Sequence, residues 1–149
     1  MSITKFRFRL EPVLQRRADQ AAAAEQALAL AHNRYNQLLI VLNDTRQRLE
    51  KTFQSGDLKK LDLFMSRQFS FYRMSLNKKI IKQKKDLNEA ARLVENKRNE
   101  AVRARQEQQV LEKLKEHGLN NFKREMALRE QKEIDEMSLA TYQRRDKSL

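Results

Sequence analysis

Between residues 10 and 49, a spacing that alternates between four and three residues continues without a break. Ten of its twelve positions are apolar, and the twelve are Leu10, Leu14, Arg17, Ala21, Ala24, Leu28, Ala31, Tyr35, Leu38, Leu42, Thr45 and Leu49. A period of 3.5 residues places these side chains on one stripe of a helix, and that stripe requires a partner along its length. The alanine-rich segment 21–31 supports this reading, because alanine is the best helix former. The pattern therefore predicts a long helix over about residues 10–54.

A second series with the same spacing follows the turn signal Gln-Ser-Gly-Asp at residues 54–57. Eight of its eleven positions are apolar, and the eleven are Leu76, Ile80, Gln83, Leu87, Ala90, Val94, Lys97, Ala101, Ala104, Gln108 and Leu111. The stripe is expected to extend upstream through Leu61, Met65, Phe69 and Tyr72, and downstream through Leu114, Phe122, Met126, Ile134 and Met137. These patterns predict a turn at about 55–58 and a second helix over about 59–145.

Two long amphipathic helices joined by a short loop predict an all-α fold, an antiparallel coiled-coil hairpin that occupies residues 1–149 as a single domain. With the turn centred near residue 57, facing residues should have numbers that add to roughly 114. This register places Leu28 near Leu87, Ala24 near Ala90 and Leu10 near Ala104. The rest of the second helix then has no partner in this chain, which indicates an external binding surface.

The composition excludes several other classes of protein. Two glycines and one proline cannot supply the turns of a β-sandwich or a doubly wound fold, and the absence of cysteine excludes thiolate chemistry. The two histidines, His32 and His117, have no second ligand at helical spacing, so no metal or other cofactor is expected. A two-helix rod also offers no pocket for a catalytic carboxylate. The longest uncharged stretch, residues 35–43, is far shorter than the roughly 20 residues that span a membrane.

The net charge of +12 indicates anionic partners. Residues 58–149 carry 23 bases and 14 acids, so most of the surplus lies in the second helix. Five lysines without an acid in the stretch 77–85 are either an anion-binding patch or a solvated helix face. A basic leucine zipper is disfavoured, because the heptad series after this stretch degrades quickly. Nucleic-acid binding remains only as a charge-driven alternative.

Four aromatic residues follow the turn within nine positions: Phe64, Phe69, Phe71 and Tyr72. Phe69 and Tyr72 fit the predicted stripe, whereas the other two project from it. The group either packs against the end of the first helix near Phe53 or forms an exposed patch for a partner protein. The sequence leaves both readings open.

The two ends of the chain resemble the FliJ family of the bacterial flagellar type III export apparatus. The resemblance rests on Phe-Arg-Phe-Arg-Leu-Glu-Pro-Val-Leu at 6–14, Arg-Ala-Arg at 103–105, Leu-Glu-Lys-Leu-Lys-Glu at 111–116 and Glu-Gln-Lys-Glu-Ile-Asp-Glu at 130–136. It implies a monomeric, non-enzymatic hairpin like the γ-subunit stalk of rotary ATPases. The implied location is cytoplasmic, peripheral to the inner membrane at the flagellar base. Stalk proteins of injectisome secretion systems share this shape and remain an alternative, as does a plain dimeric coiled-coil spacer.

The resemblance also implies partners. They are the hexameric export ATPase FliI, which the joined termini would enter and stimulate, the export gate protein FlhA, and export chaperones that the protein would escort. No specific nucleic acid is expected. The residues expected at the ATPase ring are Phe8, Arg9, Leu10, Arg103, Arg105, Lys113 and Lys115. The residues expected at the export gate are Phe71, Tyr72, Leu76, Lys79 and Gln83.

Overall fold

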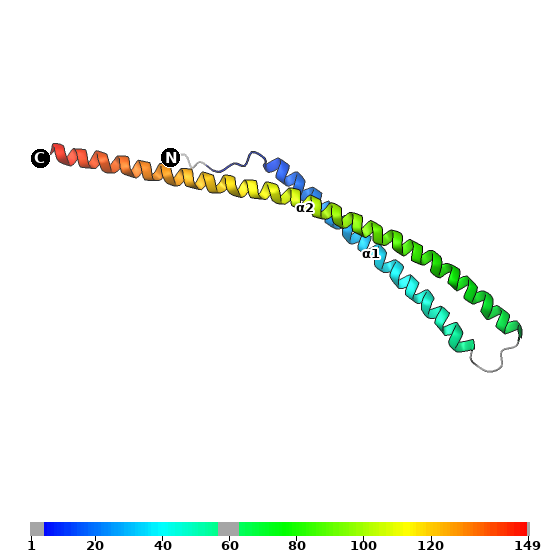
Figure 1. The fold of residues 1–149 in the computed structure, drawn as a ribbon. Coiled ribbons are helices and arrows are strands. Elements are labelled where there is room, and N and C mark those ends of the chain that lie inside the picture. The colour runs from blue at the N-terminus through cyan, green and yellow to red at the C-terminus, as the bar shows by residue number, and fades with distance from the viewer. Residues whose placement is uncertain (1–4, 57–62, 149) are drawn as a thin grey trace. The chain divides into compact units, whose positions relative to one another are not determined.

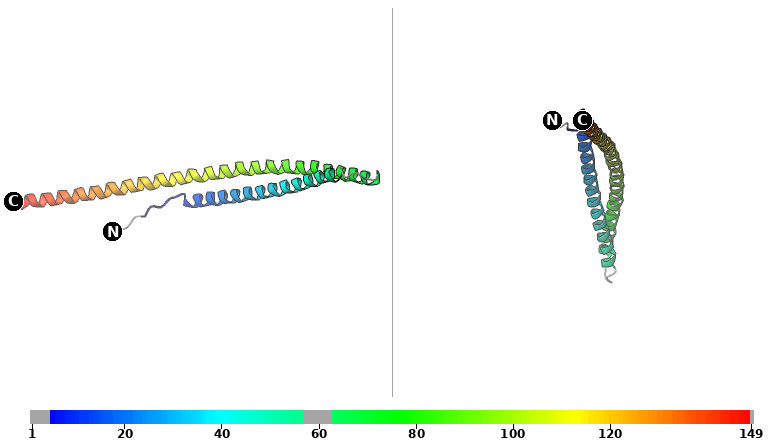
Figure 2. Two further views of the ribbon diagram at one scale, coloured as in Figure 1. Left: turned by 90° about the horizontal axis from the view of Figure 1, so that it is seen from below. Right: turned by 90° about the vertical axis from the view of Figure 1, so that its left-hand side faces the viewer.

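The computed structural model describes residues 5–56 and 63–148, and it contains two helices. Helix α1 spans Glu11–Gly56 and helix α2 spans Leu63–Lys147. The two helices pack against each other and form a hairpin, so they run in opposite directions (Figures 1 and 2). The all-α hairpin predicted from the two four-three series is confirmed.

The observed helix bounds differ from the expected ones at the turn. The turn was expected to begin at residue 55, but α1 continues through Ser55 and Gly56. None of the described glycines has a positive φ, so helical geometry persists to the end of α1. The expected turn centre at residue 57, the expected stripe residue Leu61 and the expected start of the second helix at 59 lie outside the described residues. At the other end of α1, Pro12 occupies the first turn, where its missing N–H donor costs nothing.

The positions of both four-three series face the partner helix. All eleven positions of the second series are buried or half-buried, and so are all positions of the first except Leu10, which is 38% exposed. We call these two series the seam. Its buried members are mainly small or aliphatic, namely Leu14, Ala21, Ala31, Leu42, Leu76, Ile80, Ala90, Val94 and Ala101. Small side chains allow the two helix axes to approach closely, so the seam is packed along much of α1.

The register of the hairpin differs from the expected one. The residue numbers of the contacting pairs Arg17–Glu107 and Thr52–Arg73 add to 124 and 125, rather than to about 114. Half of each observed sum is about 62, so the symmetry centre lies about five residues later along the chain than the expected centre near residue 57. The expected pairs Leu28–Leu87, Ala24–Ala90 and Leu10–Ala104 are consequently out of register.

The expected extensions of the seam also need correction. Upstream of Leu76, the same spacing leads to half-buried Arg73 and Phe69, while the expected residues Met65 and Tyr72 are exposed. Downstream of Leu111, the spacing continues without a slip through half-buried Lys115, Gly118 and Phe122.

Of the other expected downstream members, Met126 is half-buried, but Leu114, Ile134 and Met137 are exposed. Restricting the stripe to apolar residues is what misplaced these positions. An arginine, a lysine and a glycine in fact occupy seam positions.

The chain divides into two compact parts. The turn part comprises residues 20–56 and 63–104, and the terminal part comprises residues 5–19 and 105–148, within the described range. Each part contains a segment of α1 packed against a segment of α2. The two parts carry different candidate surfaces and are treated separately below.

Candidate interaction surfaces

In the terminal part, residues 5–10 precede α1 without regular secondary structure. Phe6 and Phe8 are half-buried, whereas Lys5, Arg7 and Arg9 are exposed. An alternation of this kind places aromatic rings on one side of an extended segment and cations on the other. The Phe6 ring lies 5.7 Å from the Phe122 ring, centroid to centroid, at an interplanar angle of 49°. The N-terminal segment is thereby attached to α2.

Gly118 makes room for this aromatic contact. A Cβ atom added at Gly118 would lie 3.2 Å from Cζ and 3.5 Å from Cε2 of Phe6. Although glycine and asparagine are weak helix formers, α2 continues through Gly118, Asn120 and Asn121. Glycine costs a helix about 1 kcal/mol relative to alanine. Its presence here is explained by the ring that packs against it.

Two ion pairs join α1 to α2 in the terminal part. Lys115 Nζ lies 2.8 Å from Glu11 Oε2, and Arg17 Nη1 donates to Glu107 Oε2 at 2.6 Å. All four side chains are roughly 40–50% exposed, so solvent screens each pair and its contribution to stability is about 0–1 kcal/mol. These pairs specify the register of the terminal part more than they stabilise it.

The residues expected at the ATPase ring are only partly brought together. Phe8 is half-buried and its carbonyl accepts a hydrogen bond from the Glu11 N–H at 3.1 Å. Lys115 is half-buried and paired with Glu11. The expected residues that are exposed in the terminal part are Arg9, Leu10, Arg105 and Lys113. Arg103 is exposed as well but belongs to the turn part. The observed contacts place the segment around 107–122, rather than the segment around 103–116, along residues 6–17.

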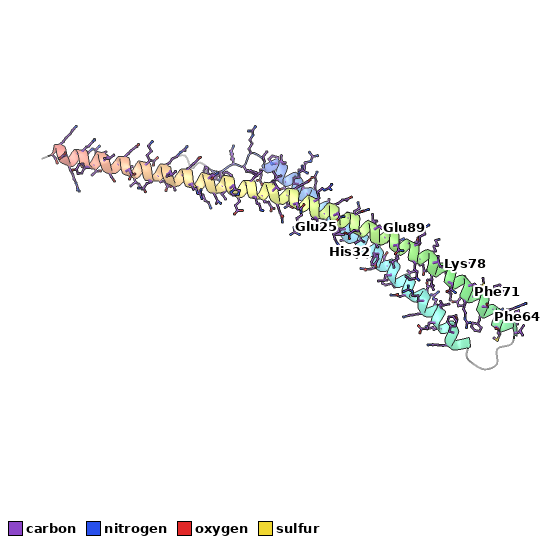
Figure 3. The ribbon with its side chains drawn as sticks, viewed as in Figure 1. Glu25, His32, Phe64, Phe71, Lys78 and Glu89 are labelled. Carbon is purple, nitrogen blue, oxygen red and sulfur yellow. The ribbon has the colours of Figure 1, made fainter. Side chains whose placement is uncertain are left out.

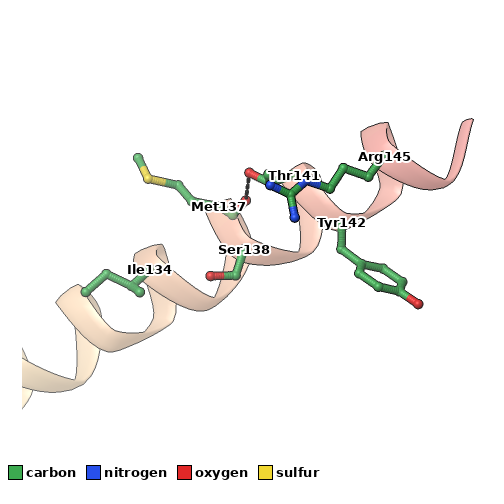
Figure 4. Close-up of a pocket in the computed structure, with 6 residues that line it drawn as sticks. All are labelled: Ile134, Met137, Ser138, Thr141, Tyr142 and Arg145. Carbon is green, nitrogen blue, oxygen red and sulfur yellow. Dashed lines mark hydrogen bonds between the residues drawn. The ribbon is translucent and has the colours of Figure 1, made fainter. Parts of the chain in front are cut away.

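The last part of α2 has no buried residue. From Ala127 to Ser148 every residue is exposed, although several side chains are large and apolar. These are Leu128, Ile134, Met137, Leu139 and Tyr142. A shallow hollow of about 410 Å³ lies along this helix and is lined by Ile134, Met137, Ser138, Thr141, Tyr142 and Arg145 (Figure 4). Ile134, Met137 and Tyr142 come together along this hollow while remaining exposed, which is typical of a site that another protein covers.

In the turn part, Arg73 links the two helices. Its Nη2 donates to the Thr52 carbonyl at 3.0 Å and its Nε donates to Thr52 Oγ1 at 3.3 Å. The guanidinium carbon also lies 4.2 Å from the centre of the Phe53 ring. The planar guanidinium group can do both, because its N–H groups donate hydrogen bonds in its plane to Thr52 while its face stacks on the ring of Phe53. Arg73 therefore occupies a seam position, where an apolar residue is more usual.

The residues expected at the export gate divide into two groups. Leu76 is only 2% exposed and Gln83 is half-buried, so both are seam residues. Phe71, Tyr72 and Lys79 are exposed. While the hairpin is closed, only these last three are accessible to a partner. Tyr72 also lines a small hollow of about 210 Å³, together with Met65, Gln68 and Phe69.

The exposure of the individual residues shows which members of the aromatic cluster and of the lysine stretch 77–85 lie on the surface. Phe64 and Phe71 are exposed, and Phe69 is half-buried in the seam. Phe53 stacks with Arg73 and is itself more than half exposed, so it does not anchor the aromatic cluster. All five lysines of the stretch 77–85 are exposed, while Ile80 between them is buried. Most of the cluster and all of the lysines therefore form surface.

Two kinds of site are missing from the part of the chain that the structure describes. Residues 5–56 and 63–148 contain no group of three or more histidine or carboxylate side chains arranged to hold a metal ion. Within the same ranges, neither α1 nor α2 has a stretch that is long and apolar enough to cross a bilayer.

The chain was compared with models of known protein families. The model of the flagellar FliJ protein family matches residues 6–147, which is nearly the whole chain. The chain belongs to the FliJ family. Searches of curated proteins and of solved structures gave no significant match. FliJ proteins are non-enzymatic components of the flagellar export apparatus at the flagellar base.

Three contact residues were not predicted from the sequence, and membership of the FliJ family does not identify them either. Arg73, Phe6 and Gly118 all make interhelix or segment contacts that the apolar pattern did not predict. Two of them carried a signal, because Arg73 and Gly118 fall on the four-three spacing when polar and small residues are allowed at its positions. Phe6 carried a weaker signal, the alternation of aromatic and basic residues at 5–9.

Proposed function

We propose that this FliJ-family protein is a stalk and adaptor of the flagellar export apparatus. Its terminal part contacts and stimulates the hexameric export ATPase, and its turn part contacts the membrane export gate. The same hairpin also escorts export chaperones. The observation that carries the proposal is the wholly exposed segment 127–148, which presents large apolar side chains on a helix.

The ATPase contact is proposed to combine this segment with the neighbouring cations. Arg9, Leu10, Arg105 and Lys113 are exposed and Phe8 and Lys115 are half-buried in the same part of the chain. A basic surface of this kind complements acidic loops in the ring and steers association. The apolar side chains of 127–148 would supply the burial that holds the complex. Arg103, which is exposed in the turn part, is proposed as a further cationic contact.

The test is stimulation of ATP hydrolysis by the cognate hexameric ATPase. Ile134→Asp combined with Met137→Asp should reduce stimulation at least tenfold, because both residues are exposed and central to the apolar surface. Leu30→Asp combined with Ile40→Asp is the matched control, since it adds the same charges at exposed positions of α1 in the turn part. Equal stimulation by the two double variants would contradict the proposed contact.

A truncation after residue 126 sharpens this test. It removes the exposed segment but keeps Phe122 and the two ion pairs, so the N-terminal segment retains its partners. We expect loss of stimulation with the melting temperature of the hairpin nearly unchanged. A truncated protein that stimulates fully would place the ATPase contact elsewhere.

The gate contact is proposed to rest on Phe71, Tyr72 and Lys79. The hollow beside Tyr72 gives an apolar centre and Lys79 gives a charged rim, as in many protein interfaces. Leu76 and Gln83 would contribute only by holding these residues in place from the seam.

Binding to the soluble domain of the gate protein tests this assignment. Tyr72→Ala should weaken binding with little change in melting, whereas Leu76→Ala should lower the melting temperature because it leaves a cavity in the seam. A Tyr72→Ala protein that binds normally would remove Tyr72 from the interface.

A further inference from the structure

One face of early α2 has a pattern of which the contacts proposed above use only Phe71. Seven exposed residues recur at spacings of three or four, and they are Leu63, Arg67, Phe71, Met74, Lys78, Ile81 and Lys85. We call this row the outer stripe. At 3.6 residues per turn, Met74 and Lys78 each lie about 160° around the helix from the buried seam residue Leu76. The outer stripe therefore lies on the side of α2 opposite the seam.

The outer stripe alternates bulky apolar side chains with cations. Leu63, Phe71, Met74 and Ile81 are each more than half exposed. Figure 3 labels Phe64, Phe71 and Lys78 along this stretch of α2. Exposed apolar residues scattered singly are normal, but four on one stripe of one helix form a continuous surface.

The charge around the outer stripe has one sign. Between Leu63 and Lys85 the sequence contains seven basic residues and no acid. Residues 40–56 of α1, which face this stretch by the observed register, add three bases and two acids. One of those acids, Asp44, lies 3.2 Å from the Arg48 guanidinium. The surface is therefore cationic whichever helix contributes to it.

These properties restrict the occupant. A second copy of the chain would bring another +12 against this surface, so self-association is opposed by charge. A nucleic acid would satisfy the cations but would leave Phe71, Met74 and Ile81 against phosphates. An anionic bilayer satisfies both, because apolar side chains enter the boundary between headgroups and acyl chains while long cationic side chains reach lipid phosphates.

We propose that the outer stripe of α2 binds directly to the surface of an anionic lipid bilayer. The helix lies on the membrane through Leu63, Phe71, Met74 and Ile81, with the basic residues at the headgroups. This contact needs no export protein, so it does not depend on the function proposed above. Each basic residue near an anionic surface strengthens binding about fivefold, and the apolar side chains add a part that salt does not screen.

Sedimentation of the full chain with vesicles tests the proposal. We expect binding to vesicles that contain phosphatidylglycerol and little binding to pure phosphatidylcholine vesicles. Lys78→Glu combined with Lys85→Glu should weaken binding about 25-fold or more, since two basic contacts are lost and reversed. The matched control is Arg129→Glu combined with Lys132→Glu, which makes the same change in net charge at exposed positions of the terminal part. The control should bind anionic vesicles within about twofold of the unmodified chain.

A fluorescent reporter tests the apolar half of the contact. The chain contains no tryptophan, so Phe71→Trp creates a single emitter on the outer stripe. Its emission should shift to shorter wavelength with anionic vesicles and should be quenched by brominated acyl chains. Leu139→Trp, at an exposed site of the terminal part, should show neither change.

Several results would overturn the proposal. One is equal loss of vesicle binding in the two double variants, which would reduce the effect to net charge. Another is an unshifted Phe71→Trp spectrum on vesicles that sediment with the protein. Loss of DNA binding in the Lys78 and Lys85 variant, with vesicle binding intact, would assign the surface to nucleic acid. Loss of binding to the gate's soluble domain, again with vesicle binding intact, would assign it to protein docking.

Discussion

The turn part and the terminal part of this hairpin are held together by different forces. In the turn part, eight apolar residues are buried in the seam, including Leu42 at 1% exposure and Leu76 at 2%. In the described terminal part, Leu14 is the one buried apolar residue. Two half-exposed ion pairs join its helices, and the contact between Phe6 and Phe122 attaches the N-terminal segment to α2.

This difference determines how easily each part can give up its internal contacts for contacts with another protein. Buried apolar surface contributes about 25 cal/mol per Å² and does not depend on salt, whereas half-exposed ion pairs contribute little and are screened. The turn part is therefore the stable half of the hairpin. The terminal part can change its contacts at small cost, which suits the part proposed to engage the export ATPase.

The largest expected effect tests the register of the hairpin, because a pair of introduced cysteines should either cross-link almost completely or hardly at all. Ala24→Cys combined with Ala101→Cys should form a disulfide within one chain under oxidation, since these numbers agree with the observed sum near 125. The chain has no cysteine of its own, so no other bond competes. Mobility on a non-reducing gel measures the product.

Ala24→Cys combined with Ala90→Cys is the control for this experiment. This pair fits the register near 114 and should remain unlinked within a chain. Efficient linking of the control pair, or linking only between chains, would contradict the observed hairpin register.

Truncating a buried side chain should lower the free energy of unfolding by several kcal/mol in the turn part and by less in the terminal part. Leu42→Ala should lower the free energy of unfolding by about 2–5 kcal/mol, because a nearly fully buried side chain leaves a cavity. Leu14→Ala in the terminal part should cost less, since its surroundings are more exposed and can collapse. Urea denaturation measures both, with exposed Ile40→Ala as a control that should stay within about 0.5 kcal/mol. A larger loss at Leu14 would reverse the comparison.

The Arg73 contact should have an intermediate effect. Arg73→Lys keeps the charge but loses the two donors to Thr52 and the stacking on Phe53, so we expect a loss of about 1–2 kcal/mol. Arg48→Lys is the matched control, because Arg48 makes only an exposed pair with Asp44 among the contacts described. Thermal melting at neutral pH compares them. If both variants melt alike, the geometry of the guanidinium is unimportant.

The smallest effect should come from the ion pairs of the terminal part. Glu107→Gln combined with Glu11→Gln should speed hydrogen exchange in the first turns of α1. The free energy of local opening should fall by less than about 1 kcal/mol. The difference from the unmodified chain should disappear in 1 M salt, where the screening length is about 3 Å. A difference that persists in high salt would show that these contacts act through packing.

The sequence predicted the fold and the seam because periodicity encodes which side of a helix is buried. It did not predict the register, because the register of a symmetric hairpin depends on where the turn is centred. The turn was expected near residue 57, whereas the pairs Arg17–Glu107 and Thr52–Arg73 centre the hairpin about five residues later.

The candidate surfaces were harder to predict for a different reason. The upstream extension of the seam was drawn through apolar residues alone, so it assigned Tyr72 to the seam and passed over Arg73. Arg73 is tolerated there because its Nε and Nη2 donate to Thr52 and its guanidinium stacks on Phe53. Leu76 was expected on a partner-binding face, but the seam series that contains it already implied burial.

The packing of Phe6 against Gly118 has an evolutionary consequence. A glycine inside a helix is a cost of about 1 kcal/mol unless some contact needs the missing side chain. Here that contact is the ring of Phe6, more than a hundred residues away in the sequence. Among related chains, loss of the aromatic residue at position 6 should therefore accompany replacement of Gly118 by alanine or a larger residue. The two positions should change together through descent, as residues in spatial contact do.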